Sequence, residues 1–452
     1  MKSIKKKQKQ EYKKTGAKIL EVLKKILHSK EFIEKHKVLP QHFTRKRVLI
    51  FPVMFSFLVN LVCRTLQVEL DECLGLLGEN KVTKQAFFKG RKKLKETAFI
   101  HLKDELVREF YKTNDFKTYK GYILIAGDGT TLQLPGSEEI EEEFGHSKNQ
   151  KGAAIPMARA SAFFDPLNEI TIDALIDRYK SDERSLCIEH IVNCNSIFDQ
   201  TQKKLLLLDM GYPALYLLFY LQRIGYDFVI RCNPTFLKEV QQVIVEGVKD
   251  IVLEIPLSRS WISHKRLETL LPEVKKEEKV RFRVVTVMLD DGTEEYLLTS
   301  LFDTVKFPRK EFKKIYNFRW GVETNYDLIK NILLIEEFTG KTALSIKQDF
   351  HATIFSRNVL QLAVQDAKEK LDKKNASKTL KYKQKINNNI STAKLKNTIV
   401  KLLLEGGDIM KLYEELTNSM LSNPNSIRPN RKNEHPKGRS RKKNHMGKKR
   451  AI

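Results

Sequence analysis

Four side chains that can bind metal ions or phosphate recur at helical spacing between residues 316 and 330. Tyr316, Arg319, Glu323 and Lys330 follow one another at steps of three, four and seven residues, which places them on one face of an α-helix. The carboxylate suits a divalent metal ion, and the other three groups suit the oxygens of a phosphodiester. The ordinary alternative is a solvated helix face with a local Arg319–Glu323 ion pair.

The apolar residues around this row predict one continuous helix. Ile315, Phe318, Val322 and Ile329 recur at helical spacing, and no proline interrupts them. The helix would bury its apolar residues and present the row of four polar side chains to a neighbouring surface.

Two aspartates upstream favour the metal interpretation. Asp128 lies within or at the end of a predicted strand at 121–135, and Asp209 ends a short apolar strand at 204–208. Taken alone, Asp128 fits an ordinary Asp-Gly turn and Asp209 fits a helix cap. It is much harder to explain by a turn and a cap that both aspartates end apolar strands and are followed by the row at 316–330.

The order of the predicted elements brings the two aspartates together. After the strand at 121–135 come a hairpin (158–165 and 170–176), a helix at 181–194 with Ser181 as its N-cap, the strand at 204–208, a helix at 214–223 and a strand at 226–231. This mixed α/β order is that of a ribonuclease-H-like fold, in which the first and fourth strands are neighbours. Asp128 and Asp209 would then meet, and a hard divalent cation between them would relieve their repulsion.

A β-rich insertion is expected between this sheet and the helix of Glu323. Residues 280–289 and 294–299 flank the turn Asp290-Asp-Gly292 and form a strong hairpin signal. We therefore expect an insertion over about 233–305.

The overall charge points to a polyanionic partner. The 452 residues carry a formal net charge of +26, and 41% of them are hydrophobic, so the chain is not disordered and nucleic acid is the simplest partner. No stretch is long and apolar enough to span a membrane, the N-terminus lacks a signal peptide, and the cysteines lack metal-site spacing. We expect a cytoplasmic protein without membrane contact.

A basic helical region precedes the strands. Residues 68–78 and 82–94 predict two short helices joined by a turn at Gly78-Glu-Asn80, with the second helix capped near Thr83. This arrangement is typical of a helix-turn-helix, although an ordinary helical hairpin with a charged face fits as well. In the DNA-binding interpretation, Lys84, Gln85 and Lys89 of the second helix contact DNA.

These motifs carry a family resemblance over roughly residues 116–360. Gly127-Asp128-Gly-Thr-Thr, Leu208-Asp209-Met-Gly-Tyr212 and the Tyr-x2-Arg-x3-Glu-x6-Lys row resemble bacterial insertion-sequence transposases of the DDE class (insertion-sequence family four type). The resemblance implies a ribonuclease-H-like domain, two Mg²⁺ or Mn²⁺ ions, and cut-and-paste transposition, often through a DNA hairpin. It also implies that Asp128, Asp209 and Glu323 bind metal while Tyr316, Arg319 and Lys330 contact transposon-end phosphates. Met210 departs from the family, which more often has a polar or basic residue there.

The expected organisation has four parts. A helical DNA-binding domain spans 1–115, a catalytic domain 116–360, a C-terminal helical region 361–422 and a basic disordered tail 423–452. The expected function is metal-dependent cleavage at transposon terminal inverted repeats and transfer into target DNA, by a dimer on DNA near the nucleoid. The alternatives are a nuclease of the same fold that does not join strands, or a catalytically silent DNA-binding descendant.

Overall fold

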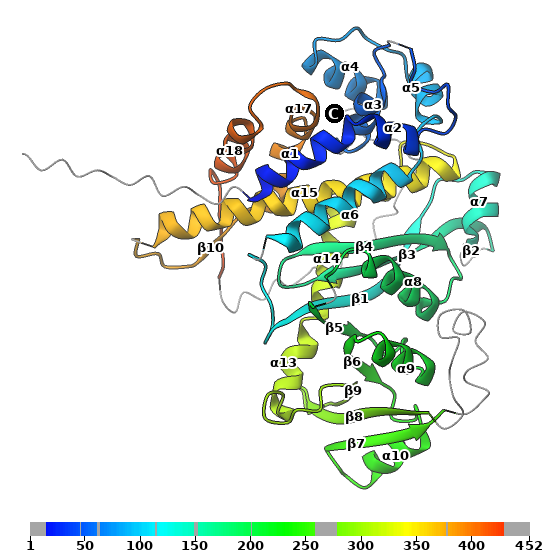
Figure 1. Cartoon of the computed structure of the whole chain (residues 1–452), viewed down its shortest axis with the longest axis vertical. Helices are drawn as coiled ribbons and strands as arrows, with labels where there is room; N and C mark the ends of the chain where they lie inside the picture. Colours follow the sequence, from blue (N-terminus) through cyan, green and yellow to red (C-terminus); the bar gives the residue numbers. More distant parts are fainter. Residues whose placement is uncertain are drawn as a thin grey trace, which may run out of the picture. The chain divides into compact units, whose positions relative to one another are not determined.

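A computed structural model describes residues 15–45, 47–60, 64–113, 115–148, 152–199, 201–257, 278–376 and 378–428. The chain divides into two compact units, residues 1–113 with 355–452 and residues 114–354 (Figure 1). We call them the helical unit and the sheet unit, after their main elements. The predicted basic tail lies outside the described residues from 429 onward.

Within the described residues, the sheet unit is built on nine strands. They run in the order β2-β3-β1-β5-β6-β9-β8-β7, and β4 pairs with β3 off this path. The strands are β1 (Tyr122–Gln133), β2 (His146–Lys148), β3 (Ala154–Asp165), β4 (Ile170–Arg178), β5 (Lys203–Leu208), β6 (Asp227–Cys232), β7 (Asp250–Pro256), β8 (Lys279–Met288) and β9 (Glu294–Thr299).

The centre of the sheet has the strand directions that the sequence predicts. β1, β3 and β4 are antiparallel to one another, while β5 is parallel to β1 and β6 is parallel to β5. The parallel pairs need crossover connections, and these contain α8 (Glu183–Asn195) and α9 (Leu215–Arg223). The predicted adjacency of the first strand and the strand before Asp209 is therefore confirmed.

The predicted insertion is partly a continuation of the same sheet. The hairpin of β8 and β9 is present as expected, but β9 pairs antiparallel with β6, so β9, β8 and β7 extend the central sheet at one edge (Figure 1). Arg283 holds this extension together, because its buried guanidinium donates to Asp250 and to the carbonyl oxygens of Leu301 and Phe307.

The N-terminal boundary of α8 differs from the sequence prediction. The N-cap of α8 is Asp182, whose side chain accepts from Ser185 N at 2.9 Å, whereas the hydroxyl of Ser181 donates to Asp177. The expected cap at Ser181 is wrong because the helix begins at Glu183, so that Asp182 is the flanking residue and its side chain accepts the capping bond.

The helix expected over 315–330 is two helices, α13 (Phe312–Asn317) and α14 (Trp320–Asn331). Between them Arg319 N donates to Tyr316 O and Gly321 N to Phe318 O, so the ladder tightens to bonds three residues apart. Gly321 also packs so closely on the turn of β3 and β4 that an added Cβ would lie 2.7 Å from Pro166 Cβ. Local spacing gives no warning of this break.

Other helices of the sheet unit are α7 (Glu138–Phe144), α10 (Lys238–Val245) and the 3-10 helix η1 (Arg309–Glu311). Helix α13 covers one face of the sheet, where Leu124, Leu205 and Leu207 meet Phe312 and Ile315 in a buried cluster. Helix α14 packs against β1 and β3, and its Val322 joins a second cluster with Ala126 and Phe164.

Helices from both ends of the chain form the helical unit (Figure 1). They are α1 (Thr15–Leu27), α2 (Lys30–His36), α3 (Phe51–Leu58), α4 (Leu66–Leu76), α5 (Lys84–Arg91), α6 (Thr97–Lys112), α16 (Asn388–Leu395), α17 (Thr398–Leu404) and α18 (Ile409–Ser419). Helix α15 (Ala343–Asn375) contributes residues to both units, and the short strands β10 (Gln384–Lys385) and β11 (Asn425–Ser426) pair with each other.

The apolar run near residue 50 forms a buried helix. Every residue of α3 is buried. Helix α17 packs against α3, and α1 packs against α6, α17 and α18. Among the described helices, none combines the length and the apolar character needed to cross a bilayer.

Candidate active site

Asp128 and Asp209 lie at the same level of two paired strands. In the parallel pairing of β1 with β5, Gly127 stands opposite Leu208, so the two aspartates occupy the next position on each strand path. Asp128 also shares a face of β1 with Leu124 and Ala126, because side chains alternate along a strand. The sequence therefore predicted this juxtaposition correctly.

A glycine permits the close approach of these strands. A Cβ added at Gly127 would lie 2.6 Å from Leu208 Cδ2 and 2.9 Å from Phe163 Cε1. Real Cβ atoms do not approach other atoms so closely, so a larger residue here would push β1 away from its neighbours.

Side chains from α13 and α14 reach both aspartates. Tyr316 Oη donates to Asp209 Oδ1 at 3.2 Å, and the Arg319 guanidinium lies 2.9 Å from Glu323 Oε1 and 4.0 Å from Asp128 Oδ2. The structure thus gathers Asp128, Asp209, Tyr316, Arg319 and Glu323 into one group on one face of the sheet. The break between α13 and α14 does not prevent this, because both helices keep these side chains turned toward β1 and β5.

Lys330, the fourth member of the row, is bound along β1. Its Nζ donates to Thr130 Oγ1 at 2.7 Å and to Thr131 O at 3.0 Å. It lies beside the strand of Asp128, and its ammonium is already held by strand groups.

The environment of Asp128 opposes its ionisation. Burial raises the pKa of this carboxyl to about 6 from an ordinary value of 3.8, and the nearby charges of Glu323 and Asp209 add to the shift. The Gly129 N–H and Arg319 act in the opposite direction. Burial also raises the pKa of Tyr316, so its hydroxyl remains a hydrogen-bond donor at neutral pH.

The raised pKa predicts that Asp128 makes the metal-free protein less stable as the pH rises. The stability contributed by the neutral carboxyl is fully present below about pH 3.8 and is lost as the pH rises through about 6. We expect Asp128→Asn, which stays neutral, to gain stability relative to the wild type between pH 5 and pH 7.5, by on the order of 1–2 kcal/mol. Urea unfolding of both proteins in EDTA at the two pH values measures this gain. If the free energies of unfolding of the two proteins differed by the same amount at both pH values, the prediction would be contradicted.

A cation can be accommodated by the oxygen ligands of this group. Within the described residues, no three His, Cys, Asp or Glu side chains stand close enough together to hold a metal ion as they are placed, since Arg319 occupies the space beside Glu323 and Asp128. The donor chemistry nevertheless fits a hard divalent ion, because the carboxylates supply oxygen only and burial disfavours the ionised form of Asp128 even beside Arg319. The Nε of Arg319 is buried and has no hydrogen-bond partner among the described residues.

A buried hydrogen-bond network behind β1 was not predicted from the sequence. The backbone carbonyl of Asp128 accepts from Tyr326 Oη at 2.9 Å and from Ser161 Oγ at 3.3 Å. His190 Nε2 lies 2.9 Å from Ser161 Oγ, and His190 Nδ1 lies 2.8 Å from Asp173 Oδ2. Because Ser161, His190 and Asp173 are buried, they fix the strand of Asp128 and are shielded from substrate. No local pattern links these five residues, which come from five different elements.

A fourth carboxylate also lies beside the two aspartates. A Cβ added at Gly129 would lie 3.1 Å from Glu183 Oε1, and one added at Gly211 would lie 2.9 Å from Glu183 Oε2. Each glycine closely follows one of the predicted catalytic aspartates, and Arg159 pairs with Glu183. The sequence gave no sign of this position for Glu183.

The predicted DNA-reading residues belong to the helical unit. Lys84, Gln85 and Lys89 are exposed on α5, and Thr83 caps this helix as expected by accepting from Ala86 N at 3.2 Å. Gln67 of α4 ties the two helices together, because its side chain accepts from Lys84 N and donates to Val82 O.

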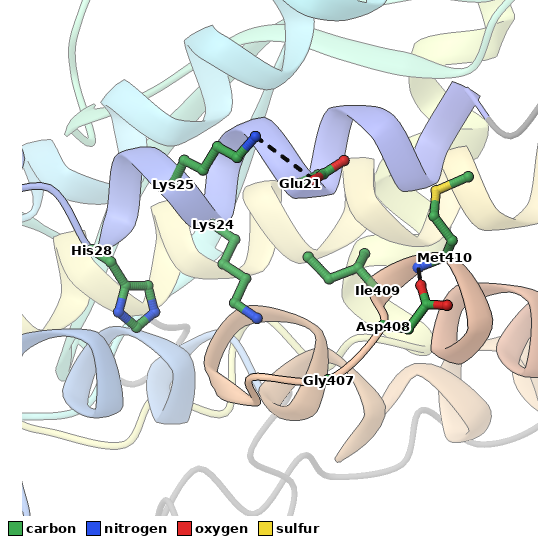
Figure 2. A pocket seen from close by; sticks show the side chains of 8 residues that line it. All are labelled: Glu21, Lys24, Lys25, His28, Gly407, Asp408, Ile409 and Met410. Carbon is green, nitrogen blue, oxygen red and sulfur yellow. Dashed lines mark hydrogen bonds and ion pairs between the residues drawn. The ribbon is translucent and has the colours of Figure 1, made fainter.

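A cavity of about 420 Å³ in the helical unit contains none of the predicted site residues. Figure 2 shows its lining, which combines Glu21, Lys24, Lys25 and His28 with residues 407–410. Lys24 Nζ donates to Glu405 O, and His28 Nε2 lies 2.9 Å from Leu403 O. These groups satisfy carbonyls at the C-terminal end of α17, which is a structural role.

Comparison with known proteins identifies one family. A family model described as "Transposase DDE domain" matches residues 119–359, more than half of the chain and a range that includes Asp128, Asp209 and Glu323. No curated protein matches. Among solved structures, the chain is similar to one titled "Cryo-EM structure of piggyBac transposase synaptic complex with hairpin DNA (SNHP)", with 10% identity, a TM-score of 0.44, and coverage of 89% of this chain and 80% of that chain.

Proposed function

This chain belongs to the family of transposases with a DDE domain, and from this premise we propose that it cuts DNA at the terminal inverted repeats of a transposable element and joins the freed ends to target DNA. The observation that carries the proposal is the grouping of Asp128, Asp209 and Glu323 with Arg319 on one face of the sheet. Carboxylates around a metal ion, with cations for phosphate, suit phosphoryl transfer.

We further propose that the catalytic domain is ribonuclease-H-like. The support is the strand order β4-β3-β1-β5-β6, with three antiparallel strands followed by two parallel ones. We propose the division made from the sequence, with a DNA-binding domain at 1–115, the catalytic domain at 116–360, a helical region at 361–422 and a basic tail from 423. We also assign the chain to the insertion-sequence type that has the Tyr-x2-Arg-x3-Glu-x6-Lys signature.

Asp128, Asp209 and Glu323 are the residues proposed to hold divalent metal, as two Mg²⁺ or Mn²⁺ ions. Transposases of this family generally use divalent ions, which when bound activate the attacking water and stabilise the leaving oxygen. Without metal, Arg319 supplies the positive charge beside Glu323 and Asp128. Its unpartnered, buried Nε is proposed to donate to a phosphate oxygen, since buried N–H groups are rarely left unsatisfied.

Tyr316 and Lys330 are proposed to contact the transposon-end phosphates beside the reacting bond. Tyr316 is already oriented by Asp209, and Lys330 by Thr130, so both can be placed with little loss of side-chain freedom. Lys84, Gln85 and Lys89 are proposed to read the terminal repeat from α5. A dimer is proposed in the DNA complex, because two transposon ends must be held together.

A strand-transfer assay tests the proposed function. A labelled duplex that ends in the element's terminal repeat with a free 3′-OH is incubated with supercoiled plasmid, Mg²⁺ and the full-length protein. We expect the label to appear in plasmid-length products. A second duplex, in which the repeat is still joined to flanking DNA, is assayed for cleavage. Cleavage of this duplex without any joined product from the first would support the nuclease alternative. Binding of the repeat without either reaction would support the silent DNA-binding alternative.

A further inference from the structure

A second cavity, of about 500 Å³, lies next to the predicted DNA-reading helix. It is formed by residues 41–45 and 47–49 and by residues of α5 and its flanks, and we call it the loop–α5 pocket. Its lining residues are Gln41, His42, Phe43, Thr44, Arg45, Arg47, Val48, Leu49, Val82, Ala86, Lys89, Gly90 and Lys93. All of them belong to the helical unit, and none belongs to the grouping of carboxylates in the sheet unit.

The charge of the loop–α5 pocket is uniformly positive. Arg45, Arg47, Lys89 and Lys93 contribute four cations, and no Asp or Glu is among the lining residues in the described part of the chain. The pKa of His42 is lowered by partial burial and by the positive charges of Lys93 and Lys37, which is a further sign of positive potential. A concave surface of one charge concentrates ligands of the opposite charge, so this pocket favours an anion.

The rest of the lining combines polar side chains (Gln41, His42 and Thr44) with apolar ones, and it includes a strained aromatic residue. Phe43 adopts φ of 58°, in the left-handed region that non-glycine residues seldom occupy. Its ring is held edge-on against Phe51 with the centroids 5.3 Å apart, and it stays only partly buried. Strained residues of this kind gather at ligand clamps, and a fixed, accessible ring offers a stacking surface for a base.

The size of the pocket narrows the choice of anion. A volume of about 500 Å³ falls within the roughly 300–1,000 Å³ of pockets that enclose whole small ligands, and a phosphate group alone needs much less. Duplex DNA presents its phosphates on a convex surface and keeps its bases stacked, so it cannot fill an aromatic-lined hollow. A nucleotide whose base has left the stack matches both the cations and the aromatic ring of the lining.

We propose that the loop–α5 pocket binds one unpaired nucleotide of a DNA strand, with its phosphate on the cluster of Arg45, Arg47, Lys89 and Lys93 and its base against Phe43. The choice of DNA as the nucleic acid rests on the proposed function. The site is separate from the catalytic carboxylates, and Lys89 contributes both to it and to the exposed face of α5. Unpaired nucleotides beside the repeat would thereby be recognised together with the duplex that α5 contacts.

Binding without metal tests this proposal independently of cleavage. Full-length protein in EDTA is titrated against a fluorescent duplex carrying one unpaired thymidine and against the same duplex fully paired. We expect the wild type to prefer the unpaired substrate by about tenfold, which corresponds to stacking of one base. Phe43→Gly should abolish the preference while leaving paired-duplex binding unchanged, because glycine accommodates the positive φ at Phe43 without strain.

A pair of lysine variants separates the pocket from general charge. Lys93→Ala is expected to weaken binding of the unpaired substrate more than Lys25→Ala, an equal charge change on the exposed side of α1. The proposal is overturned if the wild type shows no preference for the unpaired substrate, or if Phe43→Gly keeps the full preference. Should Phe43→Gly not fold, Phe43→Leu replaces it in this test. The proposal is also overturned if the two lysine variants bind the unpaired substrate equally well. A preserved preference in a protein that neither cuts nor joins DNA would support the pocket and refute the proposed function.

Discussion

Asp128→Asn is expected to lower the rate of DNA cleavage by at least about three powers of ten. The substitution keeps the size of the side chain and can keep the contact between Gly129 N–H and its oxygen, which is 2.8 Å long in the wild type. It removes the negative charge that lies beside Asp209 and Glu323, and this charge is what a divalent ion needs at the end of β1. Single-turnover cleavage of a terminal-repeat duplex measures the loss.

A matched control separates this effect from a general change of charge. Asp327→Asn removes one negative charge on the exposed side of α14, and we expect it to cleave within about threefold of the wild type. Both variants should bind the repeat at least as well as the wild type, because a lost carboxylate reduces repulsion of DNA phosphate. Cleavage by Asp128→Asn at the wild-type rate would remove Asp128 from the active site.

His190→Leu is expected to lower the free energy of unfolding of the protein by about 3 kcal/mol. Leucine retains much of the volume but forms no hydrogen bond, so the buried Asp173 carboxylate and the Ser161 hydroxyl each lose the partner that now lies 2.8 and 2.9 Å away. The stacked contact of His190 with Phe163, at 4.5 Å between centroids, is lost as well. Chemical denaturation measures the change.

An exposed histidine provides the comparison for this variant. His146→Leu changes the same residue type on the edge strand β2, and its effect should stay within about 0.5 kcal/mol. Because Ser161 donates to the carbonyl of Asp128, His190→Leu should also reduce cleavage even where the protein remains folded. Equal stability of the two leucine variants would show that the buried network does not support the strand.

The strands and the pair of aspartates were predictable because their signals are local. Short apolar runs bounded by turns define β1 and β5, and their order implies which strands pair. The attachment of β9 to β6 was not predictable, since pairing of Val229 with Thr299 joins residues far apart in sequence. An insertion with its own hairpin signal gives no indication of which sheet edge it meets.

Apart from the pair of aspartates, the contacts within the site were predictable only where a helical period encodes them. Tyr316, Arg319 and Glu323 share a face whether or not the helix is continuous. The break before Trp320 was therefore not predicted, but the predicted grouping of these side chains is unaffected by it. Glu183 and the network of Ser161 and His190 depend on tertiary contacts between several elements. Their residue types are common in ordinary helices and strands, and composition alone does not single them out.

Cleavage by Asp128→Cys in Mg²⁺ and in Mn²⁺ tests most directly whether these carboxylates bind the catalytic metal. A thiolate is a poor ligand for Mg²⁺ and a better one for the softer Mn²⁺. We predict no cleavage of the terminal-repeat duplex by this variant in Mg²⁺ and recovered cleavage in Mn²⁺, with Asp128→Asn inactive in both ions. Equal activity of Asp128→Cys in the two ions, or activity of Asp128→Asn in either, would contradict direct metal binding at Asp128.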